Sequence, residues 1–393
     1  MIYTIYHSRE SWRKPAALSL ILLLIASMLS ISTETAQVLL IGILIGFVFI
    51  HFGFGFAGNW RHFFEEKHSA GIRGHFWLLA LGSLLFFPAL SLLPNLGFSV
   101  YGAIRPLGIN VIIGAFMFGI GMALLGNCSS GALRLLGEFK LRYYWVFFCM
   151  IAGGTFAASQ FELWLTLSQW AVFSFATDLA WQQGLIINLA IIFTLYLIFI
   201  KTERHHHGEV VPLLDRNNKS YTWGVAPVIW AATLLALLNL AILLLSGNSW
   251  AVSWIFPKLG IVLIDQLGLA IDWDFWEFTA MNEEGLMKPL SEDSIILTSF
   301  GFFLGIAIYH VISILTNSPT KNRRTKLHPF NIKILIKSTF SGLIMGYGAV
   351  IAYGCNIGGF FSAIISGSIH GWAWFASAFI GMGLTLAITN RRR

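Results

Sequence analysis

The sequence predicts an all-α polytopic membrane protein of about ten spans, with broken or re-entrant short helices and an inverted internal repeat. Of 393 residues, 56% are hydrophobic and only 11% are charged, whereas a soluble domain carries about 25% charged residues. Uncharged apolar stretches of about twenty residues recur along the chain, and each is long enough to cross a hydrocarbon core of about 30 Å as a helix. A glycine-rich motif around a cysteine occurs twice, which indicates the repeat.

Ten stretches have the length and composition of membrane spans. They lie near residues 16–32, 36–56, 76–93, 105–125, 143–165, 183–200, 224–246, 295–316, 333–354 and 371–389. Lysine and arginine gather before the first stretch and after every second one, where they mark the cytoplasmic side. This pattern predicts a protein of the bacterial inner (cytoplasmic) membrane with both termini in the cytoplasm. It also accounts for the net charge of +7 without a nucleic-acid partner.

The polar loops divide the chain into two membrane repeats. Residues 1–201 are predicted to form the N-terminal repeat, 202–222 a cytoplasmic linker, and 223–393 the C-terminal repeat. The stretch 247–294 is acidic and rich in tryptophan, which is typical of an outer face. We therefore expect Trp250, Trp254, Trp273 and Trp276 to lie in an outer aromatic belt.

Two glycine-rich segments, each with one cysteine, can be laid over one another. They are GIGMALLGNCSSG (119–131) and GYGAVIAYGCNIG (346–358). Each has glycine nine and seven positions before its cysteine and three positions after it: Gly119, Gly121 and Gly131 around Cys128, and Gly346, Gly348 and Gly358 around Cys355. The predicted topology runs the two segments in opposite directions. Inverted repeats of this kind are typical of transporters, whose sites lie where helices break near the membrane midplane.

The glycines predict an interrupted helix beside each thiol. Glycine lets helices approach closely or unwind, and the residues after Cys128 and Cys355 can restart a short helix. A helix N-terminus inside the membrane offers free N–H groups and partial positive charge, which suit an anion. A thiol there is a weak donor that can contact soft, anionic sulfur. Simple helix packing and a structural cysteine are the alternative, but two copies at one offset favour the functional interpretation.

At these residues the chain resembles the YeeE/YedE family of membrane proteins. The family is associated with sulfur transport and, in characterised members, with thiosulfate uptake. GAVIAYGCNIGGFFSAIISGSIHGW (348–372) is similar to the family's Gly-Cys-Asn segment and to its Ser-x-His-Gly-Trp end, which contains His370. GMALLGNCSSGALRLLGEF (121–139) resembles the family's Gly-Cys-x-Ser-Gly segment, with Asn127 where glycine is more usual.

A third family motif departs from the usual pattern in this chain. In FGFGFAGNWRHF (52–63), Gly55 stands where the family has cysteine, and Arg61 is in place. The resemblance implies a pathway in which thiosulfate passes between cysteine thiols through S–H···S contacts. Because one thiol of that pathway is missing here, another sulfur or selenium species stays open as the substrate.

We predict a permease that takes up a small sulfur-containing anion, with thiosulfate as the first candidate. Cys128 and Cys355 are expected to contact the sulfane sulfur. The other candidate binding residues are Asn127, Asn356, Gly126, Gly131, Gly354, Gly358, Arg134 and His370. The glycines would shape the breaks, and each asparagine would donate to a substrate oxygen or cap its short helix. Arg134 would either pair with Glu138 one turn on or face the pathway.

The remaining candidate residues fit structural roles, and other classes of function stay as alternatives. Cys149 has no glycine frame and is predicted to pack in the core. Adjacent histidines point in different directions, so His205, His206 and His207 indicate a solvated loop rather than a metal site. We therefore expect no metal, no cofactor and no enzymatic activity. The expected partners are the anion, membrane lipid and, from the resemblance, a cytoplasmic sulfurtransferase. A membrane thiol oxidoreductase and a scaffold that only packs helices are the alternatives.

Overall fold

The computed structural model describes residues 32–213, 226–269, 276–315 and 331–390, and every element named within them is a helix. The first half has α3 (Thr33–His51), α4 (Phe56–Glu66), α5 (Ala70–Leu92), η1 (Pro94–Leu96), α6 (Ile109–Leu125), α7 (Ser129–Gly137), α8 (Leu141–Ser159), α9 (Phe161–Leu165) and α10 (Trp181–His207). The second half has α11 (Ala226–Ser246), α12 (Ile255–Gln266), α13 (Glu277–Met281), α14 (Glu283–Met287), α15 (Ser294–Leu315), α16 (Ile332–Ile351), η3 (Asn356–Ser362), α17 (Ala363–Ile365) and α18 (Ile369–Asn390).

The predicted all-α polytopic fold is confirmed. Eight helical stretches of the described residues are long and apolar enough to cross a membrane. Two of them, Thr33–Glu66 and Ile109–Gly137, join a long helix to a shorter one across a break. The first predicted span falls on residues 16–32, of which 16–31 lie outside the described chain.

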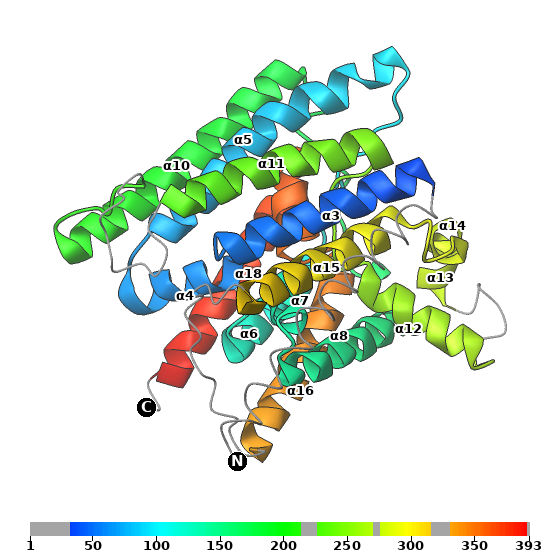
Figure 1. The fold of residues 1–393 in the computed structure, drawn as a ribbon. Helices are drawn as coiled ribbons and strands as arrows, with labels where there is room; N and C mark the ends of the chain where they lie inside the picture. Colours follow the sequence, from blue (N-terminus) through cyan, green and yellow to red (C-terminus); the bar gives the residue numbers. More distant parts are fainter. Residues whose placement is uncertain (1–31, 214–225, 270–275, 316–330, 391–393) are drawn as a thin grey trace.

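The helices form two groups around a common core (Figure 1). In one group, α5 packs against both α10 and α11, and the three helices lie side by side. In the other group, α6 packs against α16 and α18, while α16 also packs against α8. The pair of α3 and α15 lies between these groups, because α3 contacts α11 and α15 contacts α7. The interrupted helices α6 and α16 therefore pack directly against each other.

The two glycine motifs pack in a reciprocal pattern. A Cβ at Gly119 would press into the backbone of α18, and a Cβ at Gly346 would press into the backbone of α8. Two positions later, Gly121 lies against α16 and Gly348 against α6. Backbones can approach this closely only where side chains are absent. Equivalent glycines of the two motifs thus have different neighbours: Gly119 packs against α18, and Gly346 packs against α8.

Two expectations from the sequence are wrong. Trp250 is only 1% exposed and packs edge-on against Phe49, with ring centroids 5.9 Å apart. Its backbone N–H donates to Oδ1 of Asn239 at 2.7 Å, so it belongs to the core and not to an aromatic belt. The three histidines at 205–207 form the last turn of α10 rather than a loop, because the helix continues to Gly208, which ends it with a φ of +77°.

Candidate functional site

Three helices of the described chain are interrupted by the same succession of backbone conformations. In each, one residue has a positive φ, and the residue two positions later is extended and forms the N-cap of a new helix. The pairs are Gly53 and Gly55 before α4, Gly126 and Cys128 before α7, and Tyr353 and Cys355 before η3. The φ angles of the first members are +62°, +80° and +55°. Both cysteines of the repeated motif therefore stand at equivalent places.

Of the three residues with a positive φ, Gly53, Gly126 and Tyr353, only Tyr353 has a side chain, so only its conformation is strained. The left-handed region costs a residue other than glycine about 1–2 kcal/mol. Hydrogen bonds hold the chain on either side: the N–H of Tyr353 donates to Val350 at 3.1 Å, and that of Gly354 donates to Ala349 at 2.8 Å. The ring of Tyr353 also meets Phe161 edge-on at 6.0 Å. The surrounding structure therefore imposes this break on the chain.

The thiol of Cys128 is buried where α7 begins. The residue is 1% exposed, and its Sγ lies 3.2 Å from the Oγ of Ser130. Gly131 lies beside the sulfur, since a Cβ at that position would be 3.6 Å from it. The Ser129 hydroxyl is also buried and finds no hydrogen-bond partner within the described ranges. The start of α7 thus gathers one thiol and two hydroxyls around a helix N-terminus that has no side-chain cap among the described residues.

The second thiol lies in an equally closed position next to an amide that is not satisfied. Cys355 and Asn356 are both 0% exposed. Neither the oxygen nor the nitrogen of the Asn356 amide has a hydrogen-bond partner in the part of the chain that the structure describes. A buried polar group in this state costs about 1–3 kcal/mol. The Nε1 of Trp374 donates to the carbonyl of Gly354 at 2.9 Å, which holds the chain just before the cysteine.

The capping alternative for the two asparagines is wrong. The N-cap residues are Cys128 and Cys355, and the Nδ2 of Asn127 donates instead to the hydroxyl of Tyr143 at 3.0 Å. Gly358, in η3, has space beside it, because the nearest atom to a Cβ placed there is the Cβ of Ala251 at 3.7 Å.

Arg61 brings a positive charge to the helix break at Gly126 and Cys128. A Cβ at Gly126 would be 3.4 Å from its Nη1, and that nitrogen lies 3.5 Å from the carbonyl of Ala123, to which it donates. The Nε of Arg61 also donates to Glu65 at 3.1 Å. Arg61 belongs to α4, so this contact places the helix that follows the Gly55 break beside the break at Gly126.

Aromatic packing brings the third break to the same place. Phe360 of η3 stacks with Phe375 at 5.1 Å and meets the ring of Trp60, from α4, edge-on at 5.7 Å. The helix α7 also packs directly against η3. The helices that follow the three breaks therefore lie together, because α4 and α7 both contact η3, which the linear sequence does not show.

Two other predicted residues have local partners. The Nε of Arg134 donates to Oε1 of Glu138 at 3.0 Å, so the i,i+4 pairing that its spacing predicts is formed. His370 is 1% exposed, and its Nδ1 lies 2.7 Å from the Oγ of Ser368. Its Nε2 has no partner among the described residues. The contacts that the structure gives to both residues lie within their own segments.

Sequence reasoning missed two residues of this region. Ser129 has a buried, unpartnered hydroxyl, and the only sequence signal for it is its place directly after Cys128. Trp60 is 0% exposed, and its Nε1 finds no acceptor within the described ranges. Its position next to Arg61 gives no indication that it contacts η3, because that contact joins residues far apart in the chain.

Comparison with known proteins gives a consistent family assignment. A protein-family profile described as "Sulphur transport" matches residues 51–384, which include all three breaks. The thiosulfate transporter TsuA of Spirochaeta thermophila is 26% identical over 371 residues, which cover 88% of this chain and 95% of that protein. TsuA of Escherichia coli is 22% identical over 367 residues, which cover 89% of this chain and 92% of that protein.

A more local match is found in a second group of relatives. The probable transporter YedE of Salmonella typhimurium is 27% identical over 160 residues, or 40% of this chain. The match spans 36% of the length of that YedE protein, about a third.

The unsatisfied amide of Asn356 predicts an unusual response to mutation. Asn356→Leu should leave the melting temperature in detergent unchanged or raise it, because it removes a buried polar group that bonds to nothing described. Asn188→Leu is the matched control, since Asn188 is also 0% exposed but donates to Ser83 at 2.9 Å and accepts from Trp372 at 3.0 Å. The control should cost about 2 kcal/mol or more. Equal losses in both variants would mean that Asn356 is satisfied within the fold.

Proposed function

The chain belongs to the sulphur-transport family, and on this basis we propose that it takes up a small sulfur-containing anion, thiosulfate first, across the inner membrane of a bacterium. It is a multi-pass membrane protein, and its relatives are transporters rather than enzymes. In this proposal the anion passes the region where the helices that follow the three breaks lie together. Both termini lie in the cytoplasm, where a sulfurtransferase would receive the sulfur.

The observation that carries the proposal is the pair of buried thiols at equivalent helix N-termini. Cys128 and Cys355 each follow a left-handed residue by two positions and each begin a helix inside the protein. The first turn of a helix has N–H groups with no intrahelical acceptor, and it carries about half a positive charge. Two such N-termini, from α7 and η3, would hold the oxyanion end of the substrate while the thiols contact its terminal sulfur.

The polar groups without partners support the same site. Asn356 and Ser129 each directly follow a cysteine and are buried, and neither side chain is satisfied by the described residues. The Asn356 amide can donate to a substrate oxygen, and the Ser129 hydroxyl can donate or accept. A bound anion would accept hydrogen bonds from the Asn356 Nδ2 and the Ser129 hydroxyl and so recover part of the cost of leaving these groups unpaired.

The balance of charges suits passage rather than tight binding. A hydrogen bond to a charged group contributes about 1.5–3 kcal/mol, so a few neutral donors and two helix N-termini can offset part of the dehydration of a dianion. Arg61 beside Gly126 adds one full positive charge, which its neighbour Glu65 partly neutralises. A transport site must release its ion as well as bind it. Neutral thiols bind an anion less tightly than several lysines would, so they allow its release.

The reciprocal glycine packing supports an inverted repeat in which residues 1–201 and 223–393 each carry one cysteine-bearing helix break. Gly119 on α6 and Gly346 on α16 hold equivalent places against α18 and α8. Such repeats allow one half to move against the other around a fixed central site. The close backbone contacts favour small movements, because a large displacement would open packed helix surfaces to lipid.

Removal of either thiol should abolish most of the transport. We expect Cys128→Ala and Cys355→Ala each to lower uptake of radiolabelled thiosulfate about 10-fold or more, as the loss of one contact to a charged substrate implies. The assay uses bacterial cells that lack their own thiosulfate permeases, at matched membrane expression. Cys149→Ala is the control, because Cys149 is equally buried but lies within α8, away from any break.

Three outcomes decide between the proposed substrates and roles. Wild-type uptake that the two alanine variants lose supports the pathway. If the wild type takes up no thiosulfate, that substrate is wrong, and other sulfur and selenium oxyanions should be tested in the same cells. Uptake that persists in both alanine variants would return Cys128 and Cys355 to a packing role.

The first break offers a test by gain of function. Gly55 is extended, with φ of −177°, and no described atom lies within 4 Å of a Cβ placed there, so a side chain fits without strain. Gly55→Cys should raise thiosulfate uptake about 2- to 10-fold by adding one neutral donor to the path. Gly55→Ala is the matched control and should leave uptake unchanged. Equal effects of both substitutions would show that the thiol has no role at this position.

A further inference from the structure

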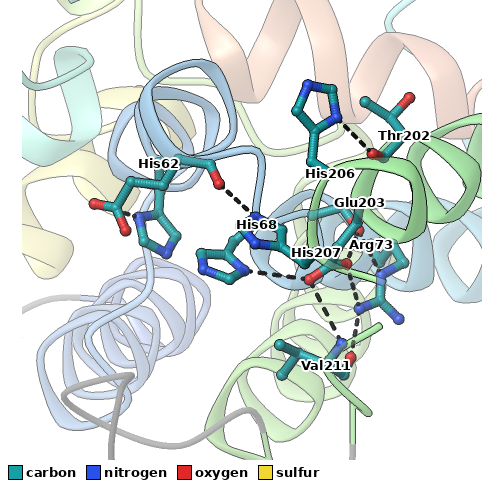
Figure 2. A network of polar contacts seen from close by, with 10 residues as sticks. His62, His68, Arg73, Thr202, Glu203, His206, His207 and Val211 are labelled. Carbon is teal, nitrogen blue, oxygen red and sulfur yellow. Dashed lines mark hydrogen bonds and ion pairs between the residues drawn. The ribbon is translucent and has the colours of Figure 1, made fainter. Parts of the chain in front are cut away.

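A cluster of histidine and glutamate side chains lies where α4 and α10 end (Figure 2). The last turns of α4 carry His62 and Glu66, and Lys67 then turns the chain with a φ of +58°. The turn brings His68 back toward the two side chains that precede it. From α10, His207 reaches the same place and lies 2.8 Å by its Nε2 from the carbonyl of Glu66. The cluster thus draws on two separate segments of the chain.

Three of these side chains have the chemistry and the spacing of metal ligands. His62, Glu66 and His68 each offer one ligand atom, and the three atoms lie within 4.8 Å of one another. Ligand atoms around a tetrahedral zinc ion are about 3.4 Å apart, because each lies about 2.0–2.2 Å from the metal. His62 and Glu66 are already close, with 3.3 Å between Nδ1 and Oε1. The side chains of Glu66 and the two histidines are 59%, 29% and 25% exposed, so small rotations can close the remaining distance.

The surroundings of His68 resemble the support that metal-binding histidines usually have. Its Nδ1 lies 3.4 Å from the Oε1 of Glu203, whose side chain is 0% exposed. Glu203 is fixed in turn by Arg73, which donates to it at 3.1 Å, and by the hydroxyl of Ser69. A carboxylate that accepts an N–H from a metal-binding histidine fixes the orientation of the ring.

His207 keeps the cluster in place rather than adding a fourth ligand. Its ring stacks on that of His68 with centroids 4.2 Å apart and planes within 5°. The neighbouring His206 turns away, with its Nδ1 3.0 Å from the carbonyl of Thr202 (Figure 2). Three protein ligands and one open coordination position remain.

We propose that His62, Glu66 and His68 form a binding site for a divalent transition-metal ion of the zinc class. Two imidazoles and one carboxylate suit zinc, cobalt or nickel, whereas calcium and magnesium prefer sites made of oxygen ligands alone. The site lies one residue from Arg61, on the helix that begins at Gly55. A bound ion would hold the end of α4 and so fix the helix that presents Arg61 to the break at Gly126.

The proposal is tested by metal binding to the purified full-length chain in detergent, without a polyhistidine tag. After equilibrium dialysis against zinc and mass-spectrometric metal analysis, the wild type should retain one zinc ion per chain and melt at a higher temperature than after chelation. His62→Ala, His68→Ala and Glu66→Gln should each weaken binding about 10-fold or more, and Glu66→Gln does so without a change of shape. Magnesium should have no effect on melting.

His206→Ala is the matched control, because it removes a nearby exposed histidine that faces away from the cluster. It should bind zinc as the wild type does. Zinc binding by His62→Ala and His68→Ala at the wild-type level would overturn the proposal. So would an equal loss in His206→Ala, which would place the ion on the 205–207 histidines. Melting of each variant without metal shows whether it folds, and transport does not enter the readout.

Discussion

A helix that breaks inside a membrane leaves backbone N–H and C=O groups that cannot bond to water, so protein or a polar cavity must enclose them. This constraint governs the centre of the present fold. The two helices that break at the cysteines pack closely against their neighbours, because Gly119 leaves no side chain between α6 and α18 and Gly346 leaves none between α16 and α8. Local turns satisfy some of the freed groups, and the first N–H groups of the new helices, which have no side-chain cap among the described residues, are the ones that the proposed function assigns to an anion.

The enclosure also explains why the site is buried and polar at once. Phe375 and Trp60 pack against Phe360 of η3, and all three side chains are buried. Inside this packing, the Asn356 amide and the Ser129 hydroxyl find no acceptor or donor among the described residues. Groups that cost stability when unpaired would be of use if a substrate accepted their hydrogen bonds. The same arrangement suits the proposed path, in which two thiols and few charged residues would line the way of the anion.

Much of the fold could be predicted from the sequence. Hydropathy indicated the helical membrane class, and the glycine frames around Cys128 and Cys355 indicated that both helices break there. The left-handed conformation of Tyr353 could not be predicted, because packing imposes it against the preference of the residue. The place of Arg61 beside Gly126 and the burial of Trp250 depend on tertiary contacts that no local pattern records. The cluster of His62, Glu66 and His68, proposed here as a metal site, could not be predicted for a related reason: it forms only because the chain turns at Lys67.

The most direct test of this account is an experimental structure of the purified protein at saturating thiosulfate. We expect the anion between the N-terminal ends of α7 and η3, with its terminal sulfur against the Sγ of Cys128 or Cys355 and an oxygen within hydrogen-bond distance of the Asn356 amide. An anion bound elsewhere, with both thiols still enclosed only by protein, would contradict the claim that the paired helix breaks form the transport site.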